Sequence, residues 1–400
     1  MCITGEGERR VTFRRDSRNW LMMWLTSLML VVLLAMTAAA GQWQPTLRFE
    51  GQVGSSRNLG TAQVMTPLFQ SENQLVYLDL RGVVASDPSR EANLGLGYRW
   101  GSQDEGWIWG LHLFADRRET ASGNLWNQVT AGVEMLGRDT QFRLNAYVPQ
   151  TGKQLAGVQV DDAIVISGTQ LIYEDAYLET YETAMSGIDV GVTRRLRGWG
   201  DDSRLSVRGF HFQAPDAPSV TGANLRFESR FNDVWNVPGS QLILGVEGQT
   251  DTIRGAQGAV TLGFSLPIGK GVAPSVTPAA DPEFRSRMME PVQRDIDIVV
   301  TTMEPVRVVE SRSDPIDAAS GEAVTGILFV SAAGDADAEG DIADPLNVAG
   351  VNDRLSDAAQ DGVRGILVVP IGADKIHTGD QGLVLMPGNI LMSKLALNSK

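Results

Sequence analysis

The stretch Ala92-Asn93-Leu94-Gly95-Leu96-Gly97-Tyr98-Arg99-Trp100 alternates between two kinds of residue. Its large apolar residues fall on one face of an extended chain, and its polar residues and glycines fall on the other. Because successive side chains of a strand point to opposite faces, a period of two predicts a strand whose two faces meet different surroundings.

The same alternation recurs from Thr46 to Leu266, interrupted by turn clusters rich in Asp, Gly, Pro and Ser. It predicts strands of about ten residues, the length that a tilted strand needs to cross the hydrocarbon layer of a membrane. The expected strands are twelve in number: 46–54, 74–84, 92–100, 106–116, 126–136, 140–148, 169–178, 186–196, 203–212, 220–230, 240–249 and 256–266.

A soluble β-sandwich would alternate as well, with its apolar face turned to a core. Here the polar faces are rich in glycine, and aromatic residues gather at the strand ends, as in the interfacial girdles of outer-membrane barrels; they are Trp100, Trp107, Trp109, Trp126, Tyr147 and Trp235. We therefore expect an all-β protein with an N-terminal antiparallel transmembrane β-barrel of about twelve strands. An outer-membrane location in a Gram-negative bacterium follows from that fold.

The N-terminus has the features of a secretory signal peptide, which we assign to residues 1–40. Five arginines precede an apolar run from Leu21 to Met36, and small residues follow, with cleavage expected between Ala40 and Gly41. The alternative is a membrane anchor, but the run is shorter than the roughly 20 residues of a spanning helix. The only cysteine, Cys2, would leave with the leader, so disulfides are not expected in the mature chain.

The charge is acidic and unevenly distributed. The formal net charge is -14, and the segment from Gly271 to Lys400 carries 10 of the 34 basic residues but 20 of the 48 acidic ones. A protein that binds nucleic acid needs a basic face for the phosphates, so we expect no nucleic-acid partner. The C-terminal third is expected to be a separate, solvated part of the chain.

Several segments, in this order, resemble the barrel of the inverse autotransporters, the intimin/invasin group of adhesins. They are Pro67-Leu68-Phe69-Gln70, Asn93 to Arg99, Trp109 to Arg117, Ala131 to Glu134, Arg143 to Tyr147 and Tyr181 to Val190. The resemblance implies a twelve-stranded barrel, here residues 41–269, that anchors the protein in the outer membrane. It also implies a linker that passes through the lumen, and a passenger displayed at the cell surface, adhesin-like and without chemical catalysis. The segment 151–168 is longer and more acidic than this resemblance leads us to expect.

Beyond the barrel we expect a linker over residues 270–320, rich in Pro and Ala at its start, and a β-rich passenger over 321–400. Short apolar segments at 327–330, 344–346, 366–369 and 382–385 are similar to the opening coils of a right-handed parallel β-helix. Asp335, Asp337 and Glu339, followed by Gly340, resemble the first half of a calcium loop, although Leu346 stands where such a loop needs its bidentate Glu.

The sequence contains no G-x-S-x-G and no H-E-x-x-H motif, and we expect no enzyme and no cofactor. The candidate functional residues are instead polar residues on the expected inner face of the barrel: Arg99, Asp116, Glu134, Arg143, Asn145 and Asp189. We hypothesise that Glu134 and Arg143 pair. Asp116, with Arg117 and Arg118 near a strand end, has two interpretations: lumen charges that hold the linker, or solvated charges of a turn. Expected partners are outer-membrane lipid, the barrel-assembly machinery and a host-surface or glycan ligand. Two other functions stay open, an open porin and an anchor for a carbohydrate-active passenger.

Overall fold

The computed structural model describes residues 43–102, 106–198, 201–268, 287–295, 297–317, 321–372, 382–385 and 387–391. The expected signal peptide, with Ala40 and Gly41, lies outside these residues. The chain forms two compact units. One contains residues 15–157 and 180–304, and the other contains residues 158–179 and 305–400.

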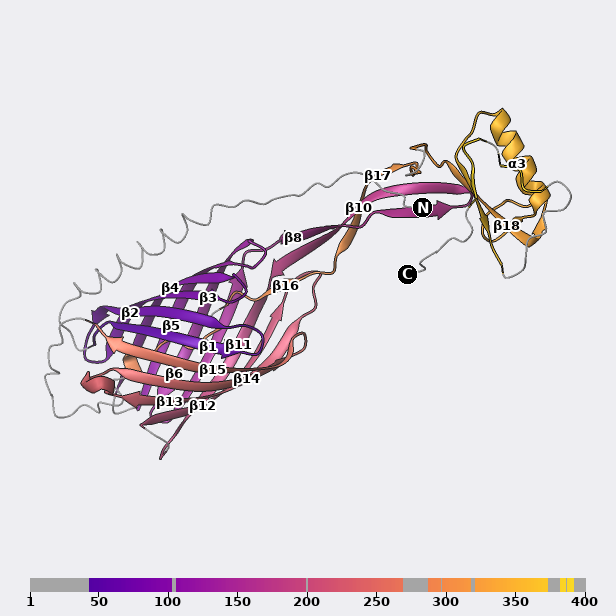
Figure 1. Cartoon of the computed structure of the whole chain (residues 1–400). Helices are drawn as coiled ribbons and strands as arrows, with labels where there is room; N and C mark the ends of the chain where they lie inside the picture. The colour runs from indigo at the N-terminus through magenta and orange to yellow at the C-terminus, as the bar shows by residue number, and fades with distance from the viewer. Residues whose placement is uncertain are drawn as a thin grey trace. The chain divides into compact units, whose positions relative to one another are not determined.

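The first unit is a closed antiparallel barrel of twelve strands (Figure 1). The chain closes on itself through β1 and β15, which pair from Thr46 with Pro267 to Gly54 with Ala259. The strands are β1 (Thr46–Gly54), β2 (Leu59–Gln70), β3 (Gln74–Ala85), β4 (Arg90–Ser102), β5 (Trp107–Glu119), β6 (Leu125–Gly137), β7 (Thr140–Pro149), β11 (Ser186–Leu196), β12 (Asp202–Gln213), β13 (Val220–Asn232), β14 (Gln241–Asp251) and β15 (Gly255–Pro267). We call the end with Thr46 and Pro267 the proximal end, and the other the distal end.

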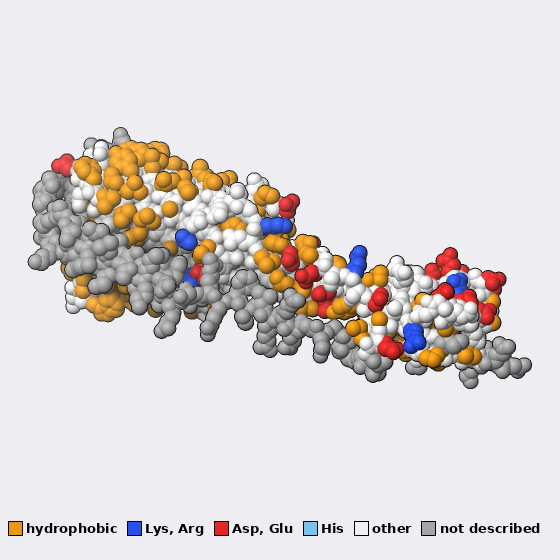
Figure 2. Space-filling view, turned by 90° about the horizontal axis from the view of Figure 1, so that it is seen from above, with side chains coloured by type: hydrophobic (Ala, Val, Ile, Leu, Met, Phe, Trp, Pro, Cys, Tyr) orange, Lys and Arg blue, Asp and Glu red, His pale blue; other side chains and the backbone are white. Residues whose placement is uncertain are grey.

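The two faces of the barrel wall differ as the alternation predicts. On β4, Leu94 and Leu96 are 50% and 51% exposed on the outside, whereas Asn93 and Arg99 on the inside are 2% and 0% exposed. Figure 2 shows hydrophobic side chains spread over the outer surface of the barrel on the side in view. An outward apolar band is what lipid requires, and a register slip by one residue would turn it inward.

One of the twelve expected strands does form but lies outside the barrel wall, and one strand of the wall was missed. Residues 169–178 belong to β10 (Gln170–Ala184), which is not part of the closed wall. Its place in the count is taken by β2, which contains Pro67 and so does not look like a paired strand. The pairing of β2 with β3 shifts between Pro67 and Phe69, and this irregularity accommodates the missing N–H.

The inner face is less polar than expected, because an apolar cluster fills the proximal half of the lumen. Its members are Trp43, Met65, Leu75, Tyr77, Ile108, Phe114, Leu136, Met288 and Val292. Inner glycines give room for the large members of this cluster. A Cβ on Gly97 would lie 2.1 Å from the Tyr77 ring, so only glycine fits there.

The second unit contains a strand arm and a small parallel sheet. The arm comprises residues 158–179, with β9 (Ala163–Ser167), the first part of β10 and the end of β8 (Lys153–Val160). Strand β17 (Val306–Ser313) pairs antiparallel with β10 from Tyr173 to Glu179. In the first unit, the other end of β10 pairs with β16 (Val300–Thr302).

The parallel sheet has the order β18 (Gly326–Asp335), β19 (Ile366–Pro370) and β20 (Ile390–Leu391). Two of the expected β-helix segments, 327–330 and 366–369, do pair in parallel, with Ile327 opposite Leu367. The segment 382–385 is not a strand. Helix α3 (Val348–Gln360), which we did not predict from the sequence, connects β18 to β19. Asn347 caps this helix by accepting a 2.9 Å bond from the Gly350 N–H. Within the described residues, no helix combines the length and apolarity that crossing a bilayer requires.

The pairing of the arm with β17 is expected to weaken in acid. Arg307 and Arg312 of β17 donate hydrogen bonds of 2.7 and 2.8 Å to Glu174, and these lower the pKa of Glu174 below its ordinary 4.5. A depressed carboxyl pKa stabilises the fold above pH 4.5, and that contribution is lost as the pH falls through the lowered value. Glu174→Gln should therefore lower the thermal unfolding midpoint at pH 7, and the difference from wild type should vanish in acid. A difference that stays constant with pH would contradict this.

Candidate functional site: the occupied lumen of the barrel

The six candidate residues all lie on the inner face and are buried. They come from five adjacent strands of the wall, in the order β4, β5, β6, β7 and β11. Their exposed fractions are at most 8% for Arg143 and 0% for Arg99 and Asn145. Buried charges are costly without partners, so the identity of those partners defines the site.

Many of the partners of the polar residues on the inner face belong to residues 287–300, which we call the luminal segment. On β4, Arg99 contacts the backbone of Met288, and Glu91, eight residues earlier in the strand, contacts Ile298. Since β4 runs from the distal to the proximal end, the luminal segment runs the opposite way. It therefore follows the barrel axis from the proximal toward the distal end.

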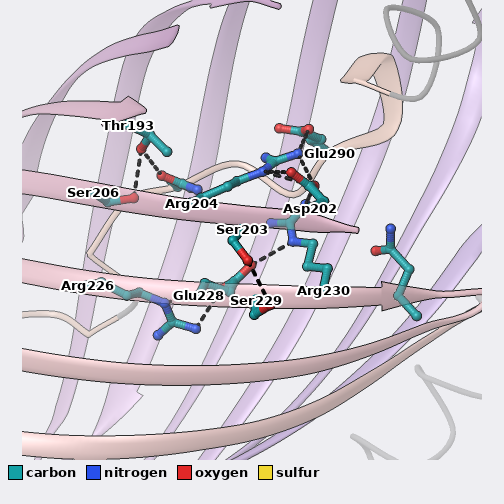
Figure 3. A network of polar contacts seen from close by, with 12 residues as sticks. Thr193, Asp202, Ser203, Arg204, Ser206, Arg226, Glu228, Ser229, Arg230 and Glu290 are labelled. Carbon is teal, nitrogen blue, oxygen red and sulfur yellow. Dashed lines mark hydrogen bonds and ion pairs between the residues drawn. The ribbon is translucent and has the colours of Figure 1, made fainter. Parts of the chain in front are cut away.

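At the proximal end, backbone and side chains of the luminal segment are both held. Arg99 donates a 2.7 Å bond to the Met288 carbonyl and forms a 2.6 Å ion pair with Glu134. Glu290 of the luminal segment forms a 2.6 Å ion pair with Arg204, which also contacts Asp202 at 2.6 Å. Figure 3 shows Arg204 between these two carboxylates.

Further along the luminal segment, Arg294 forms a 2.7 Å ion pair with Asp116, and both side chains are 0% exposed. The Arg294 guanidinium also lies over the Phe114 ring, 4.1 Å from its centroid. Asn93 and Thr130 donate further hydrogen bonds to Asp116, of 2.9 and 2.6 Å. Asp116 is thus held by the wall and bound to the luminal segment at once.

Toward the distal end, the contacts continue on other strands. Asp295 forms a 3.3 Å ion pair with Arg208, and its N–H donates a 2.7 Å bond to the Tyr147 hydroxyl. Arg118 donates a 2.8 Å bond to the Ile298 carbonyl and lies 3.7 Å from Asp297, which also pairs with Arg57. The described charged side chains of the luminal segment all meet opposite charges: Arg287, Glu290, Arg294, Asp295 and Asp297.

The family follows from comparison with known proteins. A family model described as the inverse autotransporter β-domain matches residues 11–213, just over half of the 400-residue chain. The chain belongs to this family. Its twelve-stranded barrel agrees with that membership and identifies an outer-membrane β-barrel protein. No curated protein matches the sequence.

The solved structures found to be similar to this inverse autotransporter share little sequence identity with it. A structure titled "Unveiling the Mechanism Behind the in-meso Crystallization of Membrane Proteins" has a TM-score of 0.48 and 14% identity, and covers 65% of this chain and 100% of its own. The KdgM porin with oligogalacturonate has a TM-score of 0.35 and 7% identity, covering 56% and 99%. An outer-membrane channel from Pseudomonas putida F1 has a TM-score of 0.36 and 10% identity, covering 56% and 94%.

The expected pairing of Glu134 with Arg143 is wrong, although the two residues are directly opposite each other on β6 and β7. Glu134 pairs with Arg99 instead. Arg143 donates a 3.2 Å bond to the Thr193 hydroxyl and a second bond to the Gln293 side chain. Arg143 therefore binds the luminal segment rather than Glu134. Strand register alone could not predict this contact, because the luminal segment is not part of the barrel wall.

Asn145 and Asp189 connect the wall to the same part of the luminal segment. Asn145 donates a 3.0 Å bond to Asp189 and a 3.2 Å bond to the Gln293 carbonyl. Asp189 also accepts a hydrogen bond from Tyr147. Arg204 and Arg208 of β12 were not among the predicted site residues. They lie four residues apart on the polar face of an alternating strand, which is the pattern typical of lumen residues.

The segment that resembles the first half of a calcium loop uses its carboxylates in turn hydrogen bonds. Asp335 accepts a 3.4 Å bond from the Asp337 N–H, and Asp344 accepts a 3.0 Å bond from the Glu339 N–H, so these oxygens serve as turn acceptors. Among the described residues, no three His, Cys, Asp or Glu side chains come together as a metal site would need.

Proposed function

We propose that this inverse autotransporter is an outer-membrane anchor and translocator that carries its own C-terminal part through the barrel and displays it at the cell surface. The observation that supports this is the course of the luminal segment, which runs from the proximal toward the distal end. The chain leaves β15 at the proximal end and reaches β16, beside β10, at the distal end. A chain with that course joins one side of the membrane to the other.

The charge pattern also fits a segment that is retained after passage. Arg294 and Asp116 are fully buried, and breaking a buried pair by removing one partner costs about 3–5 kcal/mol. Extended backbone in a barrel lumen is tolerated where polar groups find partners, and the wall supplies them to Met288, Gln293 and Ile298. We propose that the displayed part has an adhesin-like role, with a host-surface or glycan ligand.

A second function, an open porin, is favoured by one observation. A cavity of about 520 Å³ remains beside the luminal segment, lined in part by Arg226, Glu228 and Glu247 of β13 and β14. These side chains pair with each other rather than with the luminal segment. An open porin would give a large, steady conductance in planar bilayers, whereas a barrel holding its luminal segment should conduct weakly.

The direction of display can be tested with an epitope added after Lys400. Antibody should label intact cells as strongly as cells with a permeabilised outer membrane, because the tag follows the distal end of the barrel. An epitope inserted after Gln42, which precedes β1, is the matched control and should be labelled only after permeabilisation. If the Lys400 tag also needs permeabilisation, the proposed translocation is wrong.

A further inference from the structure

The arm lies between barrel strands β7 and β11 in sequence, yet residues 158–179 form one compact unit with residues 305–400. A loop that only joined two barrel strands could be a short turn, such as the four residues between β1 and β2 or the five between β5 and β6. The arm instead carries the hairpin of β9 and β10, with the apolar residues Ile166 and Leu171 on either side of its turn. The arm therefore makes its contacts with residues 305–400, the part of the chain that we propose is exported.

The first of these contacts is strand pairing. Residues Val306 to Arg312 of β17 lie opposite Glu179 to Glu174 of β10, and β17 begins six residues after the luminal segment ends at Val300. Arg307 adds a 2.8 Å ion pair with Asp161 of the arm, beside its pair with Glu174. Strand addition of this kind supplies backbone hydrogen bonds to an extended chain whatever its sequence.

The second contact is hydrophobic and involves the parallel sheet. Its two faces alternate along β18 and β19, and α3 covers one of them with Val351 and Leu355. The opposite face consists of Ile327, Phe329, Leu367 and Val369, all at most 2% exposed. Leu171 of the arm, 4% exposed, packs in this cluster, with Ile166 at its edge.

A backbone hydrogen bond fixes the arm against the sheet. The Ile327 N–H donates a 2.8 Å bond to the carbonyl of Thr169, at the tip of the hairpin between β9 and β10. The arm thus covers this apolar face of the sheet, as α3 covers the opposite face. Without it, a contiguous apolar face and a strand end would be open to solvent, which favours aggregation.

We propose that the arm is a template and cap for the exported segment: β10 binds β17 by strand addition, and Leu171 and Ile166 complete the core on which β18 and β19 fold. The direction of export in this inference rests on the proposed function. The arm is part of the barrel polypeptide, so it is present at high effective concentration when residues 306–371 emerge. Parallel sheets stacked on one another need such terminal caps, because each layer buries only one side of the next.

The test is Leu171→Asp, with Ile164→Asp as the matched control, since Ile164 lies on the same hairpin but is 41% exposed. Both are made in the full-length chain with the Lys400 epitope, and trypsin cleavage at Arg354 and Arg364 is followed on intact cells. Leu171→Asp should keep the heat-modifiable migration of a folded barrel and the surface epitope, but cleavage should become about a hundredfold faster. Ile164→Asp should be cleaved within about twofold of wild type.

Equal cleavage rates for wild type and Leu171→Asp would overturn the inference, as would equal acceleration by both variants. Should Leu171→Asp reduce barrel assembly, Leu171→Ala decides by the same comparison. An epitope hidden in wild-type cells would instead contradict the proposed function. The cleavage comparison would then be made on the full chain in detergent. It would still confirm or overturn the inference that the arm is a template and cap.

Discussion

The Arg294→Asp variant is expected to give a barrel with a much larger conductance than wild type in planar bilayers. The substitution places a second carboxylate beside Asp116, and the side chains of Arg294 and Asp116 are both 0% exposed. Losing one partner of a buried pair costs about 3–5 kcal/mol, so the luminal segment should leave its position more often by about two orders of magnitude or more. The loss of the contact with Phe114 adds to the effect.

The control for this experiment is the exchanged pair, Asp116→Arg with Arg294→Asp. It restores opposite charges and should return the conductance part of the way to wild type, although Asn93 and Thr130 are placed for a carboxylate. A charge change outside the barrel, Arg312→Asp, should leave the conductance unchanged because that side chain is 65% exposed on β17. An unchanged conductance in Arg294→Asp would show that this pair does not hold the luminal segment.

The Gly97→Val variant should largely fail to assemble as a folded barrel. The added Cβ would lie 2.1 Å from the Tyr77 ring, and Tyr77 is itself 0% exposed, so it has no free space to move into. Overpacking of this kind costs typically about 1–3 kcal/mol and more where neighbours cannot shift. The measurement is the fraction of heat-modifiable barrel in the outer-membrane fraction.

Gly51→Val is the matched control because Gly51 lies on the exposed face of β1, where a Cβ would have no atom within 4 Å. It should assemble as well as wild type, since an apolar side chain suits the lipid face. Normal assembly of Gly97→Val would mean that the Tyr77 side chain is free to move and that the proximal cluster is loosely packed.

The barrel wall could be predicted from sequence because every strand faces two media. Alternation between lipid and lumen depends only on neighbouring residues, so the faces of β4, β7, β11 and β15 follow directly from the pattern. Pairing needed more than local information. Residues 169–178 alternate like a wall strand but pair with β9 and β17. Strand β2 was not predicted because it contains Pro67, which cannot donate a backbone hydrogen bond.

The site was predictable in its residue types but not in its pairings. A buried charge on the inner face must have a partner, so Asp116 and Arg99 could be singled out from alternation alone. Their partners lie 178 and 189 residues away in Arg294 and Met288, on a segment outside the strands of the barrel wall. Strand register therefore suggested Arg143 for Glu134, and only the three-dimensional course of the luminal segment corrected it.

Helix α3 was missed because its apolar residues are few. Val351 and Leu355 make one turn-spaced pair, and the rest of residues 348–360 is largely polar or small. The helix is stabilised by packing on β18 and β19 and by the Asn347 cap. Of these two contributions, only the cap could be predicted from the sequence.

The central claim is that residues 287–300 lie inside the barrel that precedes them. The most direct measurement is photo-cross-linking from a photoreactive residue at Met288, in assembled protein extracted from outer membranes, followed by mass spectrometry of the peptides. Met288 packs with Leu75, Ile108 and Leu136, so cross-links to β3, β5 and β6 of the same chain are expected. Cross-links confined to lipid, to other proteins or to outward-facing residues would contradict it.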